Sequence, residues 1–212
     1  MGVSTTPEPD GSVPVTAARV PQGERTRLMR LRLMEATVES LVEVGWTGTT
    51  TTVVSQRAGV SRGAQLHHFP SKQDLVVAAV DYLTERRRLE LGVTAADLPE
   101  QGRTRAALEL IAAQYVSPVF FAALELWVAA RTDEALHEAV VRLERRFGRD
   151  AHANMIALLD IDERRGRNRQ LVQATLDLAR GLGLAASLTD DSARRASILD
   201  AWAETLDREL ET

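Results

Sequence analysis

WTGTTTTVVSQRAGVSRGAQLHHFPSKQDL, residues 46–75, holds two short helical segments separated by a tight turn. Threonines precede the first segment, and a threonine hydroxyl can accept a hydrogen bond from a free backbone N–H, so we expect this helix to begin at Thr49 or Thr50. Gly59 supplies the positive φ that ends the first helix, and Ser61 can cap the second. Helix, glycine-containing turn and helix, in that order, predict a helix-turn-helix.

The second segment has an apolar side and a side that suits a DNA groove. At about 100° per residue, Leu66 and Phe69 fall about 60° apart, and we expect both to face a core. Gly63, Ala64 and His67 point the other way, a side that carries no acidic residue. Small residues let a backbone approach closely, and Arg, Gln and His side chains can hydrogen-bond base edges. The segment therefore predicts a recognition helix for a major groove.

Several features of residues 30–75 occur together. They are the helix end Val44-Gly45-Trp46, the start Thr49-Thr50, the turn Ala58-Gly59-Val60-Ser61, the aromatic Phe69, and Ser71-Lys72 followed by Leu75. In spacing and residue type this segment resembles the DNA-binding domain of the TetR family of bacterial transcriptional regulators. The chain departs from the family pattern at Leu66, where tyrosine is usual, and at Gln65, where an aliphatic residue is usual. The family tyrosine contacts the DNA backbone, a contact that Leu66 does not supply.

The resemblance implies which residues meet DNA. Contacts with bases or phosphates are expected at Thr49, Thr50, Arg62, Gly63, Ala64, Gln65, Leu66, His67, His68 and Lys72. Charge supports this end of the chain, because residues 19–72 carry eight basic and four acidic residues while the whole chain carries a net charge of −4. The alternative is a helix-turn-helix that serves only packing or protein contact, in a helical protein-interaction module.

Composition bounds the fold and the chemistry. With 44% hydrophobic and 4% aromatic residues among 212, and little alternation of β-branched residues, the chain is expected to be all-α with about nine helices. It has no cysteine, which excludes disulfides, thiolate metal sites and a thiol nucleophile. No apolar run approaches the ~18 residues of a membrane span, and no signal peptide is visible. We therefore expect a cytoplasmic protein with no membrane partner.

Three segments follow from the pattern along the chain. Residues 1–22 lack periodicity and are expected to be a flexible tail, in which Arg19 either reaches a minor groove or belongs to a disordered extension. Residues 23–75 form the helix-turn-helix domain, and a linker helix continues to residue 91. Residues 92–212, which begin with a Gly- and Pro-containing break, form a helical effector-binding and dimerisation domain.

The body of the chain is expected to be helical throughout. Its apolar periodicity predicts helices near 104–117, 118–131, 133–160, 167–187 and 191–211. Apolar stripes on the last two predict a four-helix dimer interface, which the resemblance also implies. The stripe residues are Leu171, Thr175, Leu178, Leu182, Leu199, Trp202 and Leu206. The alternative is that both stripes fill the chain's own core.

A pocket for a small-molecule effector is expected among the body helices, as the resemblance implies. Its candidate lining residues are Tyr115, Phe120, Phe121, Trp127, Phe147 and Met155, although aromatics at helical spacing more often fill a core. Enzyme chemistry is not expected, because Glu134 and His137 form one carboxylate–histidine pair where a helical di-metal site needs two. No phosphate-binding loop or nucleophile elbow occurs, and neither a metal nor a cofactor is expected.

Together these patterns predict a ligand-responsive transcriptional regulator. As a homodimer it would bind a palindromic operator in double-stranded DNA through two recognition helices. It would repress transcription, and a small-molecule effector bound in the body would release it from DNA.

Overall fold

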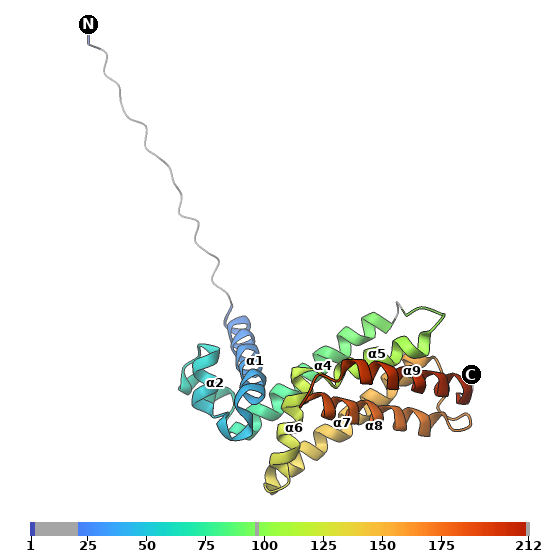
Figure 1. The fold of residues 1–212 in the computed structure, drawn as a ribbon. Helices are drawn as coiled ribbons and strands as arrows, with labels where there is room; N and C mark the ends of the chain where they lie inside the picture. Colours follow the sequence, from blue (N-terminus) through green and yellow to red (C-terminus); the bar gives the residue numbers. More distant parts are fainter. Residues whose placement is uncertain (3–20, 96–97, 211–212) are drawn as a thin grey trace.

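The computed structural model describes residues 1–2, 21–95 and 98–210. The expected flexible tail at 1–22, with Arg19, lies almost entirely outside the described residues. Within them the chain forms nine helices and no strand, which confirms the all-α fold (Figure 1). The helices are α1 Gln22–Gly48, α2 Thr51–Ala58, α3 Arg62–His68, α4 Lys72–Ala95, α5 Arg103–Gln114, α6 Pro118–Ala130, α7 Glu134–Leu159, α8 Asn168–Ala186 and α9 Ser192–Glu209.

The helix-turn-helix is confirmed, with its caps in place. Thr50 precedes α2, and its hydroxyl accepts a hydrogen bond from the N–H of Val53 at 3.2 Å. Gly59 ends α2 in the left-handed region at φ 63°. Ser61 caps α3 by accepting a hydrogen bond from the N–H of Ala64 at 3.2 Å. These hydroxyls satisfy backbone donors that a helix start leaves free, so they fix where the two short helices begin.

Helix α1 bends at Gly45, whose backbone has φ 66° and ψ −176°. This region of backbone space is open essentially to glycine alone. The bend allows the N–H of Trp46 to donate a hydrogen bond to Oε2 of Glu125 on α6 at 2.8 Å. The expected helix end at residues 44–46 therefore corresponds to a sharp bend, after which the chain stays helical as far as Gly48.

One hydrophobic cluster joins the N-terminal helices to the body. Side chains of α1, α2 and α4, with Phe69 just after α3, pack with those of α6 and the first half of α7. Leu33, Leu126 and Leu136 are each at most 1% exposed. A second cluster joins α5, α8 and α9 to the last turns of α7 around Leu108 and Met155. Helix α7 contributes to both clusters and so connects them. Burial of each leucine contributes about 1.5–3 kcal/mol to folding.

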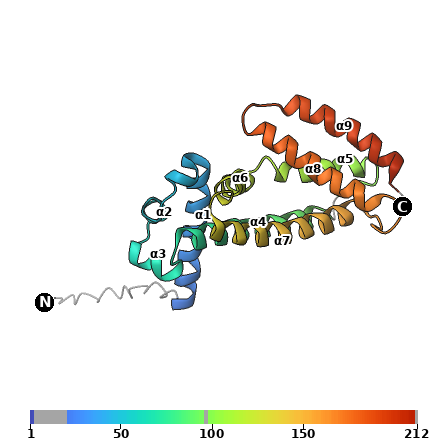
Figure 2. The same ribbon diagram turned by 90° about the horizontal axis from the view of Figure 1, so that it is seen from below.

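The body helices match the expected ranges closely. Helix α5 ends at Gln114, three residues early, because the hydroxyl of Ser117 accepts from the N–H of Phe120 at 3.2 Å and so caps α6. Helix α7 continues through Gly148 without interruption. Helices α8 and α9 lie on one side of the body, and α4 and α7 run side by side along the opposite side (Figure 2).

No single helix in the described ranges is both long and apolar enough to cross a membrane. The pair α5 and α6 reaches that length and apolarity only when the two helices are taken together, and they are bent by 56°.

Replacing Gly45 by alanine tests the bend. A Cβ at this position would lie 3.0 Å from Oε2 of Glu125 and would occupy a backbone region that disfavours side chains. We expect Gly45→Ala to lower the free energy of unfolding in urea by about 1–3 kcal/mol. Gly148→Ala is the control, because its Cβ meets nothing within 4 Å and alanine favours a helix interior. A Gly45→Ala protein as stable as the wild type would contradict this account.

Candidate DNA interface and ligand pocket

One side of α3 faces solvent at the end of the molecule opposite the C-terminus (Figure 2). Arg62, Gly63, Leu66 and His67 are exposed on it, and Leu66 is 42% exposed. Helix α3 contains no acidic residue. Within the described part of the chain the guanidinium of Arg62 has no ion-pair or hydrogen-bond partner, so it can extend outward to a nucleic acid.

Gln65 faces the core, so its expected contact with DNA is wrong. Its side chain is fully buried, and its Nε2 donates a hydrogen bond to the backbone oxygen of Phe69 at 2.8 Å. Leu66, which was expected in the core, turns outward instead. The helix is rotated by about one residue from the expected phase because two turns of helix determine that phase poorly, and a buried amide can be satisfied one turn later.

Thr49 is buried as well, at 1% exposed, and its expected contact with DNA is wrong for the same reason. Its hydroxyl donates to the backbone oxygen of Gly45 at 2.8 Å, and its N–H donates to the same oxygen at 3.1 Å. Thr49 therefore closes the turn that follows the bend in α1. Thr50 is exposed beside it, whereas Ala64 and His68 are half-buried at the edges of α3.

Lys72 is half-buried against Trp46. Its Nζ lies 3.8 Å from the centroid of the Trp46 ring and also donates to the backbone oxygen of Trp46. Burial lowers the pKa of Lys72. In this structure its ammonium holds the end of α1 against the start of α4, and a contact between Lys72 and a phosphate stays a prediction.

Two arginines fix the position of the helix-turn-helix. Arg57 pairs with Glu43, a hydrogen bond that raises the Arg57 pKa, and it also lies 3.4 Å from Oε2 of Glu39. Arg30 lies over the ring of Phe69, with 4.5 Å between its Cζ and the ring centroid. These charges are used inside the head, so they contribute less to a nucleic-acid surface than the sequence count of basic residues suggests.

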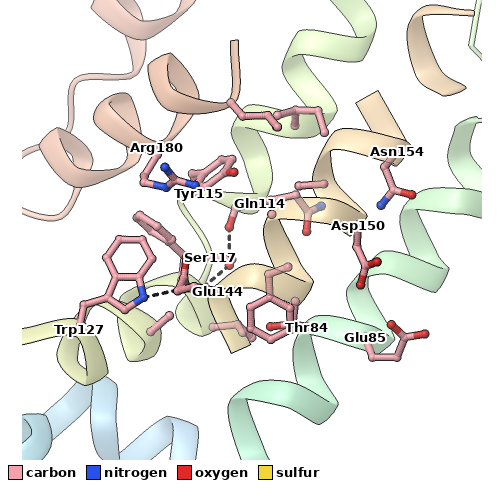
Figure 3. A pocket seen from close by; sticks show the side chains of 18 residues that line it. Thr84, Glu85, Gln114, Tyr115, Ser117, Trp127, Glu144, Asp150, Asn154 and Arg180 are labelled. Atoms are coloured by element: carbon pink, nitrogen blue, oxygen red, sulfur yellow. Dashed lines mark hydrogen bonds between the residues drawn. The ribbon is translucent and has the colours of Figure 1, made fainter. Parts of the chain in front are cut away.

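A cavity of about 150 Å³ lies among α4, α5, α6, α7 and α8 (Figure 3). Its apolar wall includes Tyr115, Phe120, Trp127 and Phe147. Its polar residues are Thr84, Glu85, Gln114, Ser117, Glu144, Asp150, Asn154 and Arg180. Aromatic rings with a few converging polar groups are typical of a small-molecule site.

Four of the six expected aromatic and apolar residues line this cavity, and two do not. Phe121 lies outside the lining, tilted against Phe120 with 6.0 Å between ring centroids. Met155 is fully buried in the second hydrophobic cluster. Both sit on helices that border the cavity but on faces turned away from it, which periodicity alone does not distinguish.

The environment of Glu144 in the cavity shifts the pKa of its carboxyl. Burial raises its pKa, against the opposing effects of a hydrogen bond from Trp127 and the charge of Arg180. The indole Nε1 of Trp127 donates to Oε1 of Glu144 at 2.8 Å, the contact drawn in Figure 3. Burial also raises the pKa of Tyr115. Over the described residues, no three His, Asp or Glu side chains are grouped so that they could hold a metal ion.

The expected dimer stripes lie mostly inside the protomer's own core, so those residues are not a free interface. Leu171, Thr175, Leu182, Leu199 and Leu206 are all buried in the chain itself. Trp202 is half-buried, and its Nε1 donates to the hydroxyl of Thr175 at 2.9 Å. Leu178 is also half-buried. An amphipathic stripe shows which face is apolar but not which neighbour covers it.

A different set of small and apolar residues, on α8 and α9 and in the turn between them, remains open to solvent. Gly181 and Leu184 on α8 and Leu188 in the turn are exposed, with Leu184 at 54% and Leu188 at 87%. Ala174 on α8 and Ala201 on α9 are exposed too. These positions adjoin the expected stripes, offset from them by roughly a quarter turn or more of helix.

The head matches a known family model, and known regulators match longer stretches of the chain. Residues 33–79 match the family model described as bacterial regulatory proteins, tetR family. The HTH-type transcriptional regulator BetI of Burkholderia mallei is 31% identical over 174 residues, which cover 77% of this chain and 84% of BetI. The chain belongs to the TetR family. The HTH-type transcriptional regulator CymR of Pseudomonas putida is 37% identical over 125 residues, and this match covers 57% of the chain and 60% of CymR.

Solved structures share the fold of this TetR-family chain. A transcriptional regulator from Pseudomonas aeruginosa PAO1 matches with a TM-score of 0.68 and 24% identity, covering 92% of this chain and 95% of that one. The multidrug binding protein EbrR, solved with malachite green, matches with a TM-score of 0.59 and 20% identity, covering 86% and 98%. At these identities the likeness concerns the fold.

Sequence reasoning missed the polar side of the cavity in this TetR-family chain. Glu144, Phe147 and Ala151 share one face of α7 at helical spacing, so the position of Phe147 could have indicated Glu144 from the sequence. Arg180, by contrast, comes from α8, and only the packing of α8 against α7 brings it to the cavity. No local signal in the sequence identifies it.

Proposed function

We propose that this chain is a homodimeric, effector-responsive regulator of transcription that binds duplex DNA through the exposed side of α3. The observation that carries the proposal is a capped, rigidly seated helix that presents Arg62, Gly63, Leu66 and His67 to solvent with no acid beside them. A two-turn helix with a small residue on its exposed side fits a major groove, and membership of the TetR family supports the same interpretation.

The proposed contacts with DNA follow from exposure. Arg62 and His67 read base edges, Gly63 permits close approach, and Thr50 lies where it can donate to a phosphate. Ala64 and His68 lie at the border of this surface. Thr49 and Gln65 are left out because both are buried.

The proposed dimer uses the open residues of α8, of α9 and of the turn between them. A two-fold pair of these helices would form a four-helix interface in which Gly181 and the neighbouring alanines permit close approach. Leu184 and Leu188 would leave water on association, because both are among the most exposed large apolar residues of the described chain. A two-fold protein presents two copies of α3, which matches a palindromic operator.

Two helices can link the cavity to the head. Helix α6 lines the cavity through Phe120 and Trp127 and holds the head through Glu125. Helix α4 lines the cavity through Thr84 and begins at Lys72, against Trp46. An effector in the cavity changes the spacing of the two heads only if it binds the two arrangements with different affinity. Release of DNA on effector binding, and therefore repression in its absence, is the proposed direction.

The proposal keeps the division into a DNA-binding head at 23–75, a linker helix, and an effector-binding and dimerisation body up to 212. Helix α4 continues to Ala95, four residues past the expected end of the linker. The head also shares a hydrophobic cluster with α6 and α7, so head and body are two functional units that pack as neighbours. A regulator of this kind works in the cytoplasm, where the DNA is.

Fluorescence anisotropy with labelled DNA tests the proposal. DNA from beside the protein's own gene, or from a random-library selection, is titrated at two salt concentrations with unlabelled random competitor. We expect saturable binding that survives competitor. If Arg62 makes a bidentate guanine contact, Arg62→Ala lowers operator affinity by about 1–3 kcal/mol and relaxes specificity at one base position.

Arg25→Ala, in an exposed residue of α1, is the matched control and should leave the base preference unchanged. Equal weakening of Arg62→Ala on operator and random DNA would make Arg62 a phosphate contact. No binding by the wild type to any library member at either salt concentration would contradict the proposal and favour a helical protein-interaction module.

Gly181→Arg tests the proposed dimer. A Cβ at Gly181 meets nothing within 4 Å in the protomer and the position is exposed, so the fold should tolerate a side chain there, while a long charged one blocks a close helix pair. Analytical ultracentrifugation should show a dimer for the wild type and a monomer for Gly181→Arg. Ala157→Arg, in an exposed residue of α7, should remain a dimer. A dimeric Gly181→Arg protein would place the interface elsewhere.

A further inference from the structure

We infer that the cavity among α4 to α8 takes an organic cation with a flat aromatic body, and that Glu144 supplies its counter-charge. This inference rests on the proposed effector role of the cavity. It follows from the charges and rings that the five helices bring together there (Figure 3).

Carboxylates outnumber cationic groups around the cavity. Glu85, Glu144 and Asp150 line it, against a single guanidinium from Arg180. Glu144 is half-buried, burial raises the pKa of its carboxyl, and its Oε1 accepts a hydrogen bond from Trp127. Its Oε2 has no hydrogen-bond or ion-pair partner in the described part of the protein, so one carboxylate oxygen is left for a ligand.

Arg180 neutralises this site only in part. Its charge opposes the effect of burial on the pKa of Glu144, but its Nη1 donates to Oδ1 of Asp177 at 2.7 Å, so the guanidinium is shared with a carboxylate outside the cavity. Its Cζ lies over the Trp127 ring, 5.7 Å from the centroid, so a ligand cation would share this part of the aromatic wall with Arg180. The Nε of Arg180 is buried without a partner among the described residues and remains a donor to a polar atom of the ligand.

The ring wall suits a flat cation. Tyr115 packs edge-on against Phe120 with 5.2 Å between centroids and 80° between planes. Phe120 packs edge-on against Trp127 at 6.0 Å and 87°. Aromatic faces attract cations, and a carboxylate in a partly buried site attracts them more strongly than it would in water. A ligand that lacks positive charge would cover the Glu144 carboxylate without offsetting the free-energy cost of removing that charge from water.

The test compares two probes of the same shape and different charge. N-methylacridinium is a planar aromatic cation, and acridine above neutral pH is its uncharged counterpart, and both are followed by fluorescence. We expect the wild type to prefer N-methylacridinium. Glu144→Gln keeps a hydrogen-bond acceptor for Trp127 and should weaken binding of the cation about tenfold or more, while binding of acridine changes little.

Glu138→Gln is the control, because it is the same substitution on an exposed position of α7. Equal affinity of the wild type for the two probes, or a Glu144→Gln protein that binds the cation normally, would overturn the inference. Preference for an anionic probe such as anilinonaphthalene sulfonate would overturn it in favour of Arg180. DNA binding is measured separately, and each variant should still bind DNA. A wild-type protein that does not bind DNA would contradict the proposed function but would leave the inferred ligand class of the cavity untouched.

The exposure of Leu66 carries a second inference: the geometry points to Leu66 as a reader of thymine methyl groups. Leu66 is 42% exposed on the same side of α3 as Arg62 and His67. A leucine cannot donate to a phosphate or a base edge, but it can pack against the one apolar group that a base pair shows in the major groove, the C5-methyl of thymine. This inference also rests on α3 as the DNA-binding helix.

Replacing thymine by uracil removes that methyl group and leaves base pairing unchanged. In a site selected by the wild type, each thymine is replaced in turn. We expect replacement of one thymine in each half-site to lower the affinity of the protein for the site about three- to fivefold, the effect of one buried methyl group. Leu66→Ala should lose that sensitivity, and His67→Ala should keep it.

Uniform tolerance of uracil by the wild type would overturn the role of Leu66 while leaving specific DNA binding intact. The same thymine sensitivity in Leu66→Ala would assign the methyl contact to another residue. Failure of the wild type to select any sequence would instead count against the proposed function.

Discussion

The N–H of Trp46 and the carboxylate of Glu125 meet at 2.8 Å where α1 bends, and the arrangement of head and body depends on this contact. The bend requires the backbone of Gly45, and the ring of Trp46 lies beneath the ammonium of Lys72, 3.8 Å from the ring centroid. The end of α1, the start of α4 and the middle of α6 therefore meet at one tryptophan. Around them, Leu33 and the apolar residues of α6 and α7 share a hydrophobic cluster that leaves the head little freedom to tilt independently.

This construction gives the cavity a physical connection to the proposed DNA-binding surface on α3. Helices α4 and α6 both line the cavity and both contact Trp46, α4 through Lys72 and α6 through Glu125, so a ligand that moves either helix moves the head with it. Packed helices shift between discrete arrangements more readily than they deform, which suits a switch with two states. The recognition helix stays rigid in this scheme, because Ser61 caps its start and the buried Gln65 amide bonds to Phe69 at its end.

The parts of the fold that could be predicted from the sequence are those that local chemistry determines. Thr50, Gly59 and Ser61 act within one turn of themselves, so the helix-turn-helix was readable from their order. The phase of α3 could not be predicted, because seven residues fit two rotations, and the sequence does not distinguish a glutamine that reaches a groove from one whose Nε2 donates to the backbone inside the core. The dimer stripes failed differently: apolar periodicity was right, but α5 and α7 cover those faces. Arg180 reached the cavity through tertiary packing alone.

Hydrogen-exchange mass spectrometry of the chain, alone and with DNA selected from a random library, tests most directly whether the exposed side of α3 is the DNA-binding surface. Contact with DNA should slow exchange of backbone amides in residues 50–68, because a bound duplex excludes water from that side. Amides of α9, at the far end of the body, should exchange at the same rate with and without DNA. Bound DNA that leaves residues 50–68 unprotected while protecting another part of the chain would contradict the account.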